Sequence, residues 1–326
     1  MTLDSELKQI KGRGNSTWAR PKKPYNIKFD KKTSLLGMDK AKKWSMLAAY
    51  FDPVFNKDPI GFEIAKYFDQ EFVSDYRFAD LYINNEYQGA YIICEPVEIG
   101  ENRINITDLG KATEKANDDA DLETFPIEHG EPFNTVSEAQ WVNIPNDPSN
   151  ITGGYLIEAE FQGRVSDEVS YFATSQKQYY TLKEPEYASK KQVEYISNYV
   201  QEMEDAIISP NGYNKHGKHY TDYIDIDSFV NMYVLHEIAC DPDIGYSSFY
   251  FSLDMSAEGD KKLRLDNPWD WDSALGVRAK TVENSTGMYA SLSSNPWLAL
   301  MTKATFFKQK VAAKWAALKA ANLFTR

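Results

Sequence analysis

Hydrophobic and polar residues alternate along two short stretches in the last third of the chain. Within residues 247–253, Phe249, Phe251 and Leu253 alternate with Ser248, Tyr250 and Ser252, and within residues 261–267, Leu263 and Leu265 alternate with charged residues. A period of two is typical of a half-buried β-strand, and the Ala-Glu-Gly-Asp run at 257–260 supplies turn residues between the stretches. We therefore predict an antiparallel hairpin in which Ser247 and Asn267 face each other about 5 Å apart.

Acidic residues flank this predicted hairpin on both sides: Asp241 and Asp243 precede it, and Asp270 and Asp272 follow it. The hairpin would gather all four into one small volume. Carboxylates that lie so close repel one another unless a cation lies between them, and Mg²⁺ prefers oxygen ligands. The pattern therefore predicts a divalent-metal site. The alternative is that the first pair caps a helix end or turn and that the second pair consists of loop acids beside two buried tryptophans.

The N-terminal stretch 8–29 predicts another hairpin, with a glycine-containing turn and a returning strand rich in lysine. Gly12 and Gly14 let the backbone approach a ligand closely, and Lys22 and Lys23 can supply positive charge to phosphate groups. The period-two pattern of the returning strand places Lys23, rather than Lys22, on the inward face. By itself this signal is weak, since exposed lysine pairs are usually solvated.

Further periodic segments predict the remaining elements. Residues 57–69 fit an amphipathic helix capped by Asp58 and burying Ile60, Ile64 and Phe68, with Glu63 as a surface acid rather than the partner of a strand lysine. The other predicted elements are a hairpin over 78–95, strands over 153–160 and 179–183, and helices over 187–208, 228–239 (capped by Asp225 or Asp227) and 296–324. Residues 108–150 show no period, so we expect a long loop or insertion there.

Length and composition bound the class of protein. With 326 residues, the chain is long for a single core, which favours two lobes. We predict an α+β fold with a β-rich N-terminal lobe (about 1–185, with the insertion at 108–150) and a mainly helical C-terminal lobe (about 186–326). The net charge of −12 argues against nucleic acid as a partner. The two cysteines exclude a disulfide scaffold.

The sequence shows no apolar run of eighteen or more residues, so we expect no membrane span. The first fifteen residues lack the apolar core of a signal peptide, although an export signal could lie upstream of Met1.

Several blocks of the sequence, in the same order, resemble the spore-coat CotH kinase family. They are RGNSTW and KKPYNIKF within 13–29, WSMLAAYFDPVFNKDPIGFEIA at 44–65, LYINNEYQGAYIICEPVEI at 81–99, GGYLIEAE at 153–160, LKEPE at 182–186 and NPWDWDSALG at 267–276. The resemblance runs over nearly the whole chain and implies one atypical protein-kinase-like domain over 1–326. The order of acids, hairpin and acids also matches protein kinases, although no H-R-D triplet is present.

This resemblance implies phosphoryl transfer from ATP, with Mg²⁺ or Mn²⁺, to Ser or Thr of a partner protein. It implies a set of site residues. They are Lys23 at the nucleotide phosphates with Lys22, Arg13, Asn15 and Ser16 beside it, Asp243 and secondarily Asp241 at the acceptor hydroxyl, and Asp270 with Asp272 at the metal. It also implies a bacterial spore coat, a cell surface or, with an upstream export signal, secretion. The oligomeric state and the acceptor protein stay open.

The sequence departs from the family pattern at two places. Lys57-Asp58 stands where a basic residue followed by Asn is expected, and Asp266-Asn267 stands where a small residue is expected before Pro-Trp. Neither departure removes a predicted metal or phosphate contact.

Three other functions stay open on sequence grounds. The first is a nucleotide-binding or adhesion module without catalytic activity, which would keep the same acids. The second is a glycosidase, suggested by 21 tyrosines and 7 tryptophans, which would need two acids about 5–10 Å apart and no Lys23. The third is a kinase-like enzyme that transfers AMP instead of phosphate.

Overall fold

The computed structural model describes residues 5–130, 136–276, 295–321 and 323. Its N-terminal part forms an antiparallel five-stranded sheet in the order β1-β2-β3-β5-β4. The strands are β1 (Leu7–Gly12), β2 (Tyr25–Thr33), β3 (Ala41–Leu47), β4 (Tyr76–Ile83) and β5 (Glu86–Cys94). Both predicted N-terminal hairpins are confirmed, and Asn84 and Asn85 have the positive φ angles, 51° and 66°, that suit a tight β4–β5 turn.

A second antiparallel sheet has seven strands in the order β12-β11-β8-β10-β9-β7-β6. Its strands are β6 (Ile127–Gly130), β7 (Val136–Val142), β8 (Tyr155–Glu160), β9 (Tyr171–Thr174), β10 (Tyr179–Glu184), β11 (Phe249–Leu253) and β12 (Arg264–Asn267). The predicted division near residue 185 stays a prediction, and the strand pairing shows that the segments on its two sides share this sheet.

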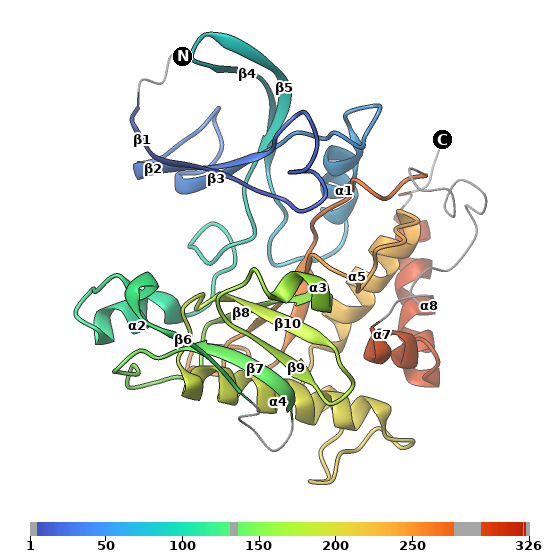
Figure 1. Ribbon diagram of the computed structural model, residues 1–326. Coiled ribbons are helices and arrows are strands. Elements are labelled where there is room, and N and C mark those ends of the chain that lie inside the picture. The colour runs from blue at the N-terminus through green and yellow to red at the C-terminus, as the bar shows by residue number, and fades with distance from the viewer. Residues whose placement is uncertain (1–4, 131–135, 277–294, 322, 324–326) are drawn as a thin grey trace.

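The helices lie mainly around the second sheet (Figure 1). They are α1 (Lys57–Ala65), α2 (Leu109–Ala116), α3 (Gln162–Val165), α4 (Lys190–Ile208), α5 (Ile226–Ile238), α7 (Pro296–Met301) and α8 (Thr305–Ala320), with short 3₁₀ turns at Leu122–Thr124 and Tyr220–Asp222. Figure 1 shows the five-stranded sheet at the top beside α1, with α4 beneath the seven-stranded sheet and α5, α7 and α8 to one side. In the described residues, no helix is both long and apolar enough to cross a membrane.

One face of the seven-stranded sheet is apolar and the other carries polar groups, because residues of similar polarity pair across neighbouring strands. One row across the strands is apolar and consists of Phe249, Ala159, Tyr180, Phe172 and Ala139. The next row, on the opposite face, consists of Asn267, Tyr250, Glu158, Thr181 and Tyr171. The apolar row belongs to the main core, which also takes in α4, α5, Phe62 of α1 and Ile92 of β5. One core therefore joins both sheets.

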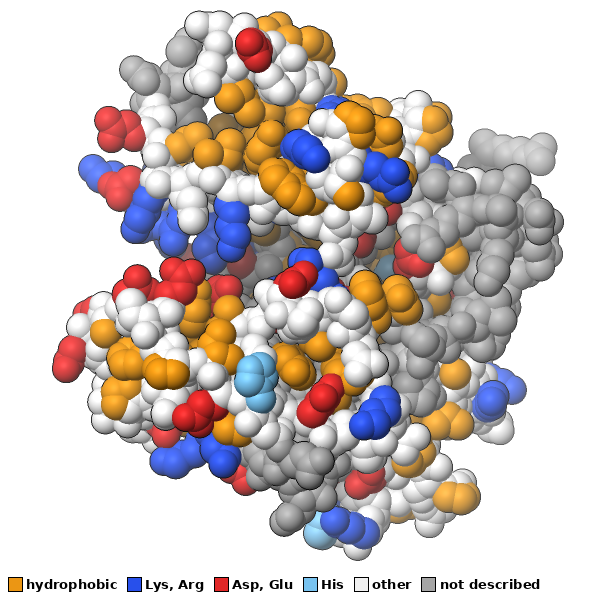
Figure 2. All heavy atoms as spheres, viewed as in Figure 1, with side chains coloured by type: hydrophobic (Ala, Val, Ile, Leu, Met, Phe, Trp, Pro, Cys, Tyr) orange, Lys and Arg blue, Asp and Glu red, His pale blue; other side chains and the backbone are white. Residues whose placement is uncertain are grey.

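Charged side chains of opposite sign face each other where the two parts meet. Figure 2 shows the surface hollowed there, with basic groups along the rim of the upper part and acids on the lower part. Desolvation raises the pKa of the half-buried Glu184 of β10, and Lys43 of β3 lies close enough to oppose this rise. In the same way, desolvation lowers the pKa of Lys28 of β2, and Glu114 of α2 opposes that change. This electrostatic attraction complements the shared apolar core.

Most of the predicted elements are confirmed, but four details are wrong. Residues 108–150 contain α2, β6 and β7 rather than one long loop, since their apolar positions are too few to show a period. The predicted tail helix is divided into α7 and α8. In the hairpin, Asn267 pairs with Tyr250 rather than with Ser247, because the second strand begins at Arg264 and the connection between the strands is longer than predicted.

The fourth correction concerns α1. Its buried face carries Phe62 and Ala65, whereas Ile60 is 36% exposed. Asp58 lies inside the first turn and is buried instead of capping the helix. Period alone did not identify the face because both faces carry apolar residues. As predicted, Glu63 is an exposed acid, and the structure pairs it with Lys66.

Candidate functional site

One predicted acidic segment, the acid loop (residues 241–243), follows directly from the end of α5. The helix ends at Ile238, Cys240 follows with a φ of +49°, and the backbone N–H of Asp241 donates to the carbonyl of His236. The Asp241 carboxylate lies 2.6 Å from Nδ1 of His236 and accepts a hydrogen bond from the backbone N–H of Asp243 at 3.0 Å. His236 and Asp241 are both 2% exposed. Asp241 therefore fixes the conformation of the acid loop. This conformation determines the position of Asp243, which is half-buried.

The other predicted segment, the Asp-Trp-Asp segment (residues 270–272), follows β12. Trp271 is fully buried and its ring stacks on His236, with 4.4 Å between ring centroids. Asp270 is exposed and has a φ of +67°, in the left-handed region. The His236–Trp271 stack thus connects the acid loop to the Asp-Trp-Asp segment.

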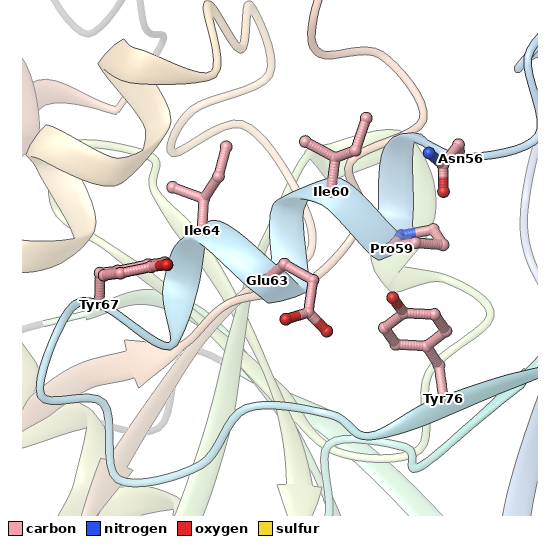
Figure 3. Close-up of a pocket in the computed structure, with 7 residues that line it drawn as sticks. All are labelled: Asn56, Pro59, Ile60, Glu63, Ile64, Tyr67 and Tyr76. Carbon is pink, nitrogen blue, oxygen red and sulfur yellow. The ribbon is translucent and has the colours of Figure 1, made fainter. Parts of the chain in front are cut away.

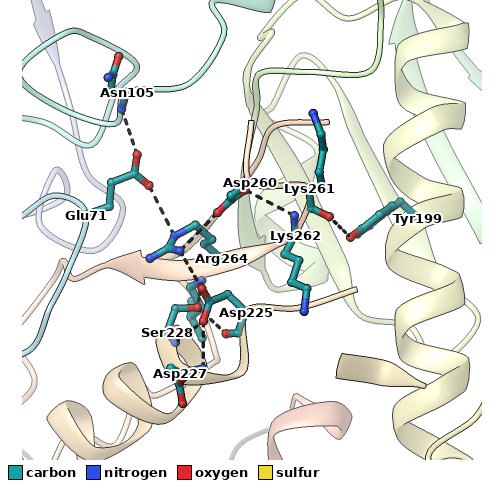
Figure 4. Close-up of polar contacts among 11 residues, drawn as sticks. Glu71, Asn105, Tyr199, Asp225, Asp227, Ser228, Asp260, Lys261, Lys262 and Arg264 are labelled. Carbon is teal, nitrogen blue, oxygen red and sulfur yellow. Dashed lines mark hydrogen bonds and ion pairs between the residues drawn. The ribbon is translucent and has the colours of Figure 1, made fainter. Parts of the chain in front are cut away.

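A polar network holds the starts of α5 and β12 together. The Arg264 guanidinium lies 2.8 Å from Asp225 and 3.8 Å from Glu71, and Asp225 caps α5 by accepting from the backbone N–H of Ser228 (Figure 4). The prediction of Asp225 as a cap is confirmed. Because α5 leads into the acid loop and β12 leads into the Asp-Trp-Asp segment, this network helps to fix the two segments relative to each other.

The acids of both segments act on one another electrostatically. Burial raises the pKa of Asp272 to about 8, and repulsion from Asp270, Asp58 and Asp243 adds to this rise, while a hydrogen bond from Ser273 opposes it. Charges inside a protein are screened less than charges in water, so these acids influence one another without touching. Asp243, Asp270 and Asp272 therefore share one electrostatic environment, although they come from segments on opposite sides of the hairpin.

Asp58 joins this group and was not among the candidate site residues. It is 4% exposed, and its Oδ1 accepts a hydrogen bond from the backbone N–H of Trp271 at 3.0 Å. Burial and the nearby Asp270 raise the pKa of Asp58 to about 7, against the opposing effects of Trp271 N–H and Arg13. The only sequence signal was the Lys57-Asp58 departure from the expected pattern.

Arg13 is the predicted nucleotide-binding residue that reaches the acids. Its guanidinium lies over the ring of Trp269, 5.5 Å from the centroid, and is close enough to Asp58 to oppose the rise in the pKa of that acid. Asn15 and Ser16 are exposed in the turn that follows. Gly12 is required beside this turn, since a Cβ there would lie 2.4 Å from the Trp18 ring.

Lys22 and Lys23 contact other groups. Lys23 donates from Nζ to the carbonyl of Trp18 at 2.6 Å and lies over the Trp18 ring. Lys22 donates to the carbonyl of Ala90 and lies between the rings of Phe55 and Tyr91, 4.7 Å and 4.8 Å from their centroids. Burial lowers the pKa of Lys22. The inward placement of Lys23 assumed a strand that includes it, whereas β2 begins at Tyr25.

The oxygen-rich group of acids has the donor chemistry of a Mg²⁺ or Mn²⁺ site. In addition, the Asn267 side chain is 1% exposed and its amide makes no hydrogen bond within the described part of the chain. It lies across the ladder from Tyr250, whose pKa is raised by burial, with Glu158 and Asp270 adding to the rise and Arg13 opposing it. In the described ranges, however, no three His, Cys, Asp or Glu side chains are already arranged to hold a metal ion. Asp270 and Asp272, with Asn267 nearby, are the residues that could hold one.

A small pocket lies on the other side of α1, away from these acids. Its lining includes Ile60, Glu63, Ile64 and Tyr76, and Figure 3 shows the Glu63 carboxylate pointing toward the Tyr76 hydroxyl. Burial raises the pKa of Tyr76, and Glu63 adds to the rise through its charge and by accepting the hydrogen bond of the hydroxyl. None of the predicted site residues lines this pocket.

Comparison with known proteins identifies the family. No curated protein is similar enough to the sequence to provide a named relative. The family described as CotH kinase protein matches residues 10–326, which is nearly the whole chain. The match supports a kinase-like function, and the family name links it to the spore coat. Arg13 and the acids of the candidate site all fall inside the matched range. Because the match covers nearly the whole chain, the chain belongs to the CotH kinase family.

Proposed function

We propose that this protein transfers the γ-phosphoryl group of ATP, with a divalent metal ion, to a Ser or Thr hydroxyl of a protein substrate. The observation that carries the proposal is the convergence of three separate segments. Asp243 of the acid loop adds to the rise in the pKa of Asp272. Arg13 of the N-terminal turn opposes the rise in the pKa of Asp58, which itself acts on Asp272. Phosphoryl transfer depends mainly on positioning and on charge neutralisation, which acids around a metal and a nearby arginine provide.

Asp243 is the residue that we assign to the acceptor hydroxyl. It follows a turn fixed by the buried Asp241–His236 pair, so its backbone position is well determined. A carboxylate there can orient the hydroxyl and accept its proton as the oxygen attacks phosphorus. Asp241 has only a supporting role, because its carboxylate is already hydrogen-bonded to His236.

Asp270 and Asp272 are assigned to the metal ion, with the buried Asn267 amide as an additional oxygen donor. When bound, a divalent cation neutralises charge on the transferred phosphate and orients it. Burial raises the pKa of Asp272 and repulsion from the other acids adds to the rise, and a bound cation would relieve that repulsion. We assign Arg13 to the nucleotide phosphates, as a guanidinium is suited to bidentate phosphate contacts.

We propose that the five-stranded sheet with α1 is the N-terminal lobe of an atypical kinase-like fold and that the seven-stranded sheet with its helices is the C-terminal lobe. This division gives each lobe one complete sheet. The assignments of Lys23, Lys22, Asn15 and Ser16 to the nucleotide remain predictions. The same holds for a spore-coat or cell-surface location, which the family name favours.

Incubation with ATP, Mg²⁺ or Mn²⁺ and a serine-rich acceptor protein, followed by mass spectrometry of the acceptor, tests the proposal. The expected product carries added phosphate on Ser or Thr. We expect Asp243→Asn to lower the rate about 10²–10⁴-fold, the usual contribution of a positioned acid or base. Asp118→Asn serves as the matched control because Asp118 is an exposed acid on the turn after α2. Added AMP, or no product with any acceptor, would contradict phosphoryl transfer.

A further inference from the structure

Helix α1 holds the segment 270–275, which begins with the proposed metal ligands of the Asp-Trp-Asp segment, by two hydrogen bonds to its backbone. The Lys57 Nζ donates to the carbonyl of Leu275 at 2.7 Å, and the Asp58 carboxylate accepts from the N–H of Trp271 at 3.0 Å. Lys57 and Asp58 are only 7% and 4% exposed. A buried lysine and a buried aspartate side by side are costly unless they are engaged. Here both engage main-chain groups of one distant segment.

The same face of α1 packs tightly on that segment. Gly61, one turn after Lys57 and Asp58, lies against the Trp271 ring, where a Cβ would approach ring atoms to 2.3 Å. Phe62 lies 5.9 Å from the Trp269 ring, between centroids. Residues at i, i+3 and i+4 share one helix face, so the hydrogen bonds and the packing act together.

The segment has an unfavourable backbone conformation that needs support from outside. Asp270 and Leu275 both have left-handed φ angles, +67° and +53°, which disfavour residues other than glycine. Leu275 is also tied to the end of α5, where its N–H donates to the carbonyl of Ala239 at 2.7 Å. The segment is therefore held between α1 and the helix that leads into the acid loop.

The N-terminal end of α1 is held in place by the turn that precedes the helix. The Asp52 carboxylate accepts from the backbone N–H groups of Val54, Asn56 and Lys57, at 3.0, 2.6 and 2.7 Å. Asp52 is 5% exposed. This turn places Lys57 and Asp58 at the first turn of the helix, directly facing the segment.

We propose that Lys57 and Asp58 are positioning residues that hold the Asp-Trp-Asp segment in the geometry that binds the divalent cation. This inference rests on the proposed function for the identity of the ligand, and it explains why an acid and a lysine are buried on α1. Residues that contact and orient the metal ligands, without touching the metal, typically contribute about 10–100-fold to metal affinity. The position of α1 would then determine whether the proposed site binds its cation.

Two pairs of variants separate positioning from charge. Asp58→Ala removes the acceptor for the Trp271 N–H, whereas Asp58→Asn keeps an acceptor and removes only the negative charge. Lys57→Met removes the donor to Leu275, whereas Lys57→Arg keeps one. Lys66→Met is the control, because Lys66 lies at the C-terminal end of the same helix and pairs with the exposed Glu63.

The measurement is Mn²⁺ affinity by calorimetry without nucleotide, together with hydrogen exchange of backbone amides 270–276. We expect Asp58→Ala and Lys57→Met to weaken Mn²⁺ binding about tenfold or more and to speed exchange in this segment. Asp58→Asn, Lys57→Arg and Lys66→Met should stay near wild type. If Asp58→Asn weakens binding as much as Asp58→Ala, simple charge attraction explains the result and the inference is wrong.

The two variant pairs are independent, so a folding failure of Asp58→Ala leaves the Lys57 pair to decide. Unchanged Mn²⁺ affinity in folded Lys57→Met would overturn the inference. A wild-type protein that binds Mn²⁺ but transfers no phosphate would contradict the proposed function alone, since the affinity comparison needs no transfer. A wild-type protein that binds no Mn²⁺ would overturn both.

Discussion

His236 and Asp241 form a buried hydrogen-bonded pair at the end of α5, with 2.6 Å between Nδ1 and Oδ2 and 2% exposure on each side chain. The same imidazole stacks on Trp271. One histidine thereby contacts both acidic segments of the proposed site, so the pair should affect stability as well as activity.

We expect Asp241→Ala to lower the free energy of unfolding by about 2–3 kcal/mol, because it leaves the His236 ring nitrogen buried without its charged partner. Urea unfolding monitored by circular dichroism measures this change. Asp118→Asn, at an exposed acid, should change stability by less than about 0.5 kcal/mol. A similarly small effect of Asp241→Ala would show that the pair does not stabilise the loop.

Asp270→Asn should abolish metal-dependent ATP turnover while leaving the fold intact. Asp270 is exposed, so little packing is lost, and Asn tolerates the φ of +67° that Ala would not. Turnover with Mg²⁺ or Mn²⁺ and the thermal unfolding midpoint are the two measurements. Undiminished turnover in this variant would exclude Asp270 as a metal ligand.

Arg13→Gln should weaken ATP binding in the presence of Mg²⁺ about tenfold, since one charge-assisted hydrogen bond contributes about 1.5 kcal/mol. Lys23→Gln should have a smaller effect, because Lys23 already bonds the Trp18 carbonyl. Calorimetry compares both with Lys11→Gln, a change at an exposed lysine of β1. A larger loss for Lys23→Gln than for Arg13→Gln would reverse the assignment of the principal phosphate contact.

Stability should fall between about pH 4.5 and pH 8, in part because of Glu160. Burial, with repulsion from Glu158, raises the pKa of Glu160 from 4.5 to about 8. In this window the folded state keeps a proton that the unfolded state has released. Raising the pH therefore favours unfolding, with a slope of at most about 1.4 kcal/mol per pH unit for one group.

Glu160→Gln should flatten this dependence, because glutamine is neutral throughout the range. Denaturant unfolding at several pH values compares it with Glu101→Gln, a change at an exposed acid. Equal slopes for Glu160→Gln and the wild type would mean that Glu160 is ionised in the folded protein at low pH.

The amino-acid sequence by itself determined most of the local structure. Period-two alternation located the hairpins, and the 3.6-residue pattern located α4, in which Val193, Ile196 and Val200 are buried. Turn residues such as Asn84 and Asn85 act locally, so their signal is present in the sequence. The family resemblance and the clustering of acids around the β11–β12 hairpin were also visible at this level.

Only the tertiary structure decided which side chains complete the site. Asp58 meets Trp271 across 213 residues, and no local period marks such a contact. Lys23, which the pattern placed inward, instead contacts Trp18, while Arg13 approaches the acids. Local periodicity reports whether a residue faces a core, because burial repeats with the backbone. The identity of the partner depends on how separate elements pack, which only the folded chain determines.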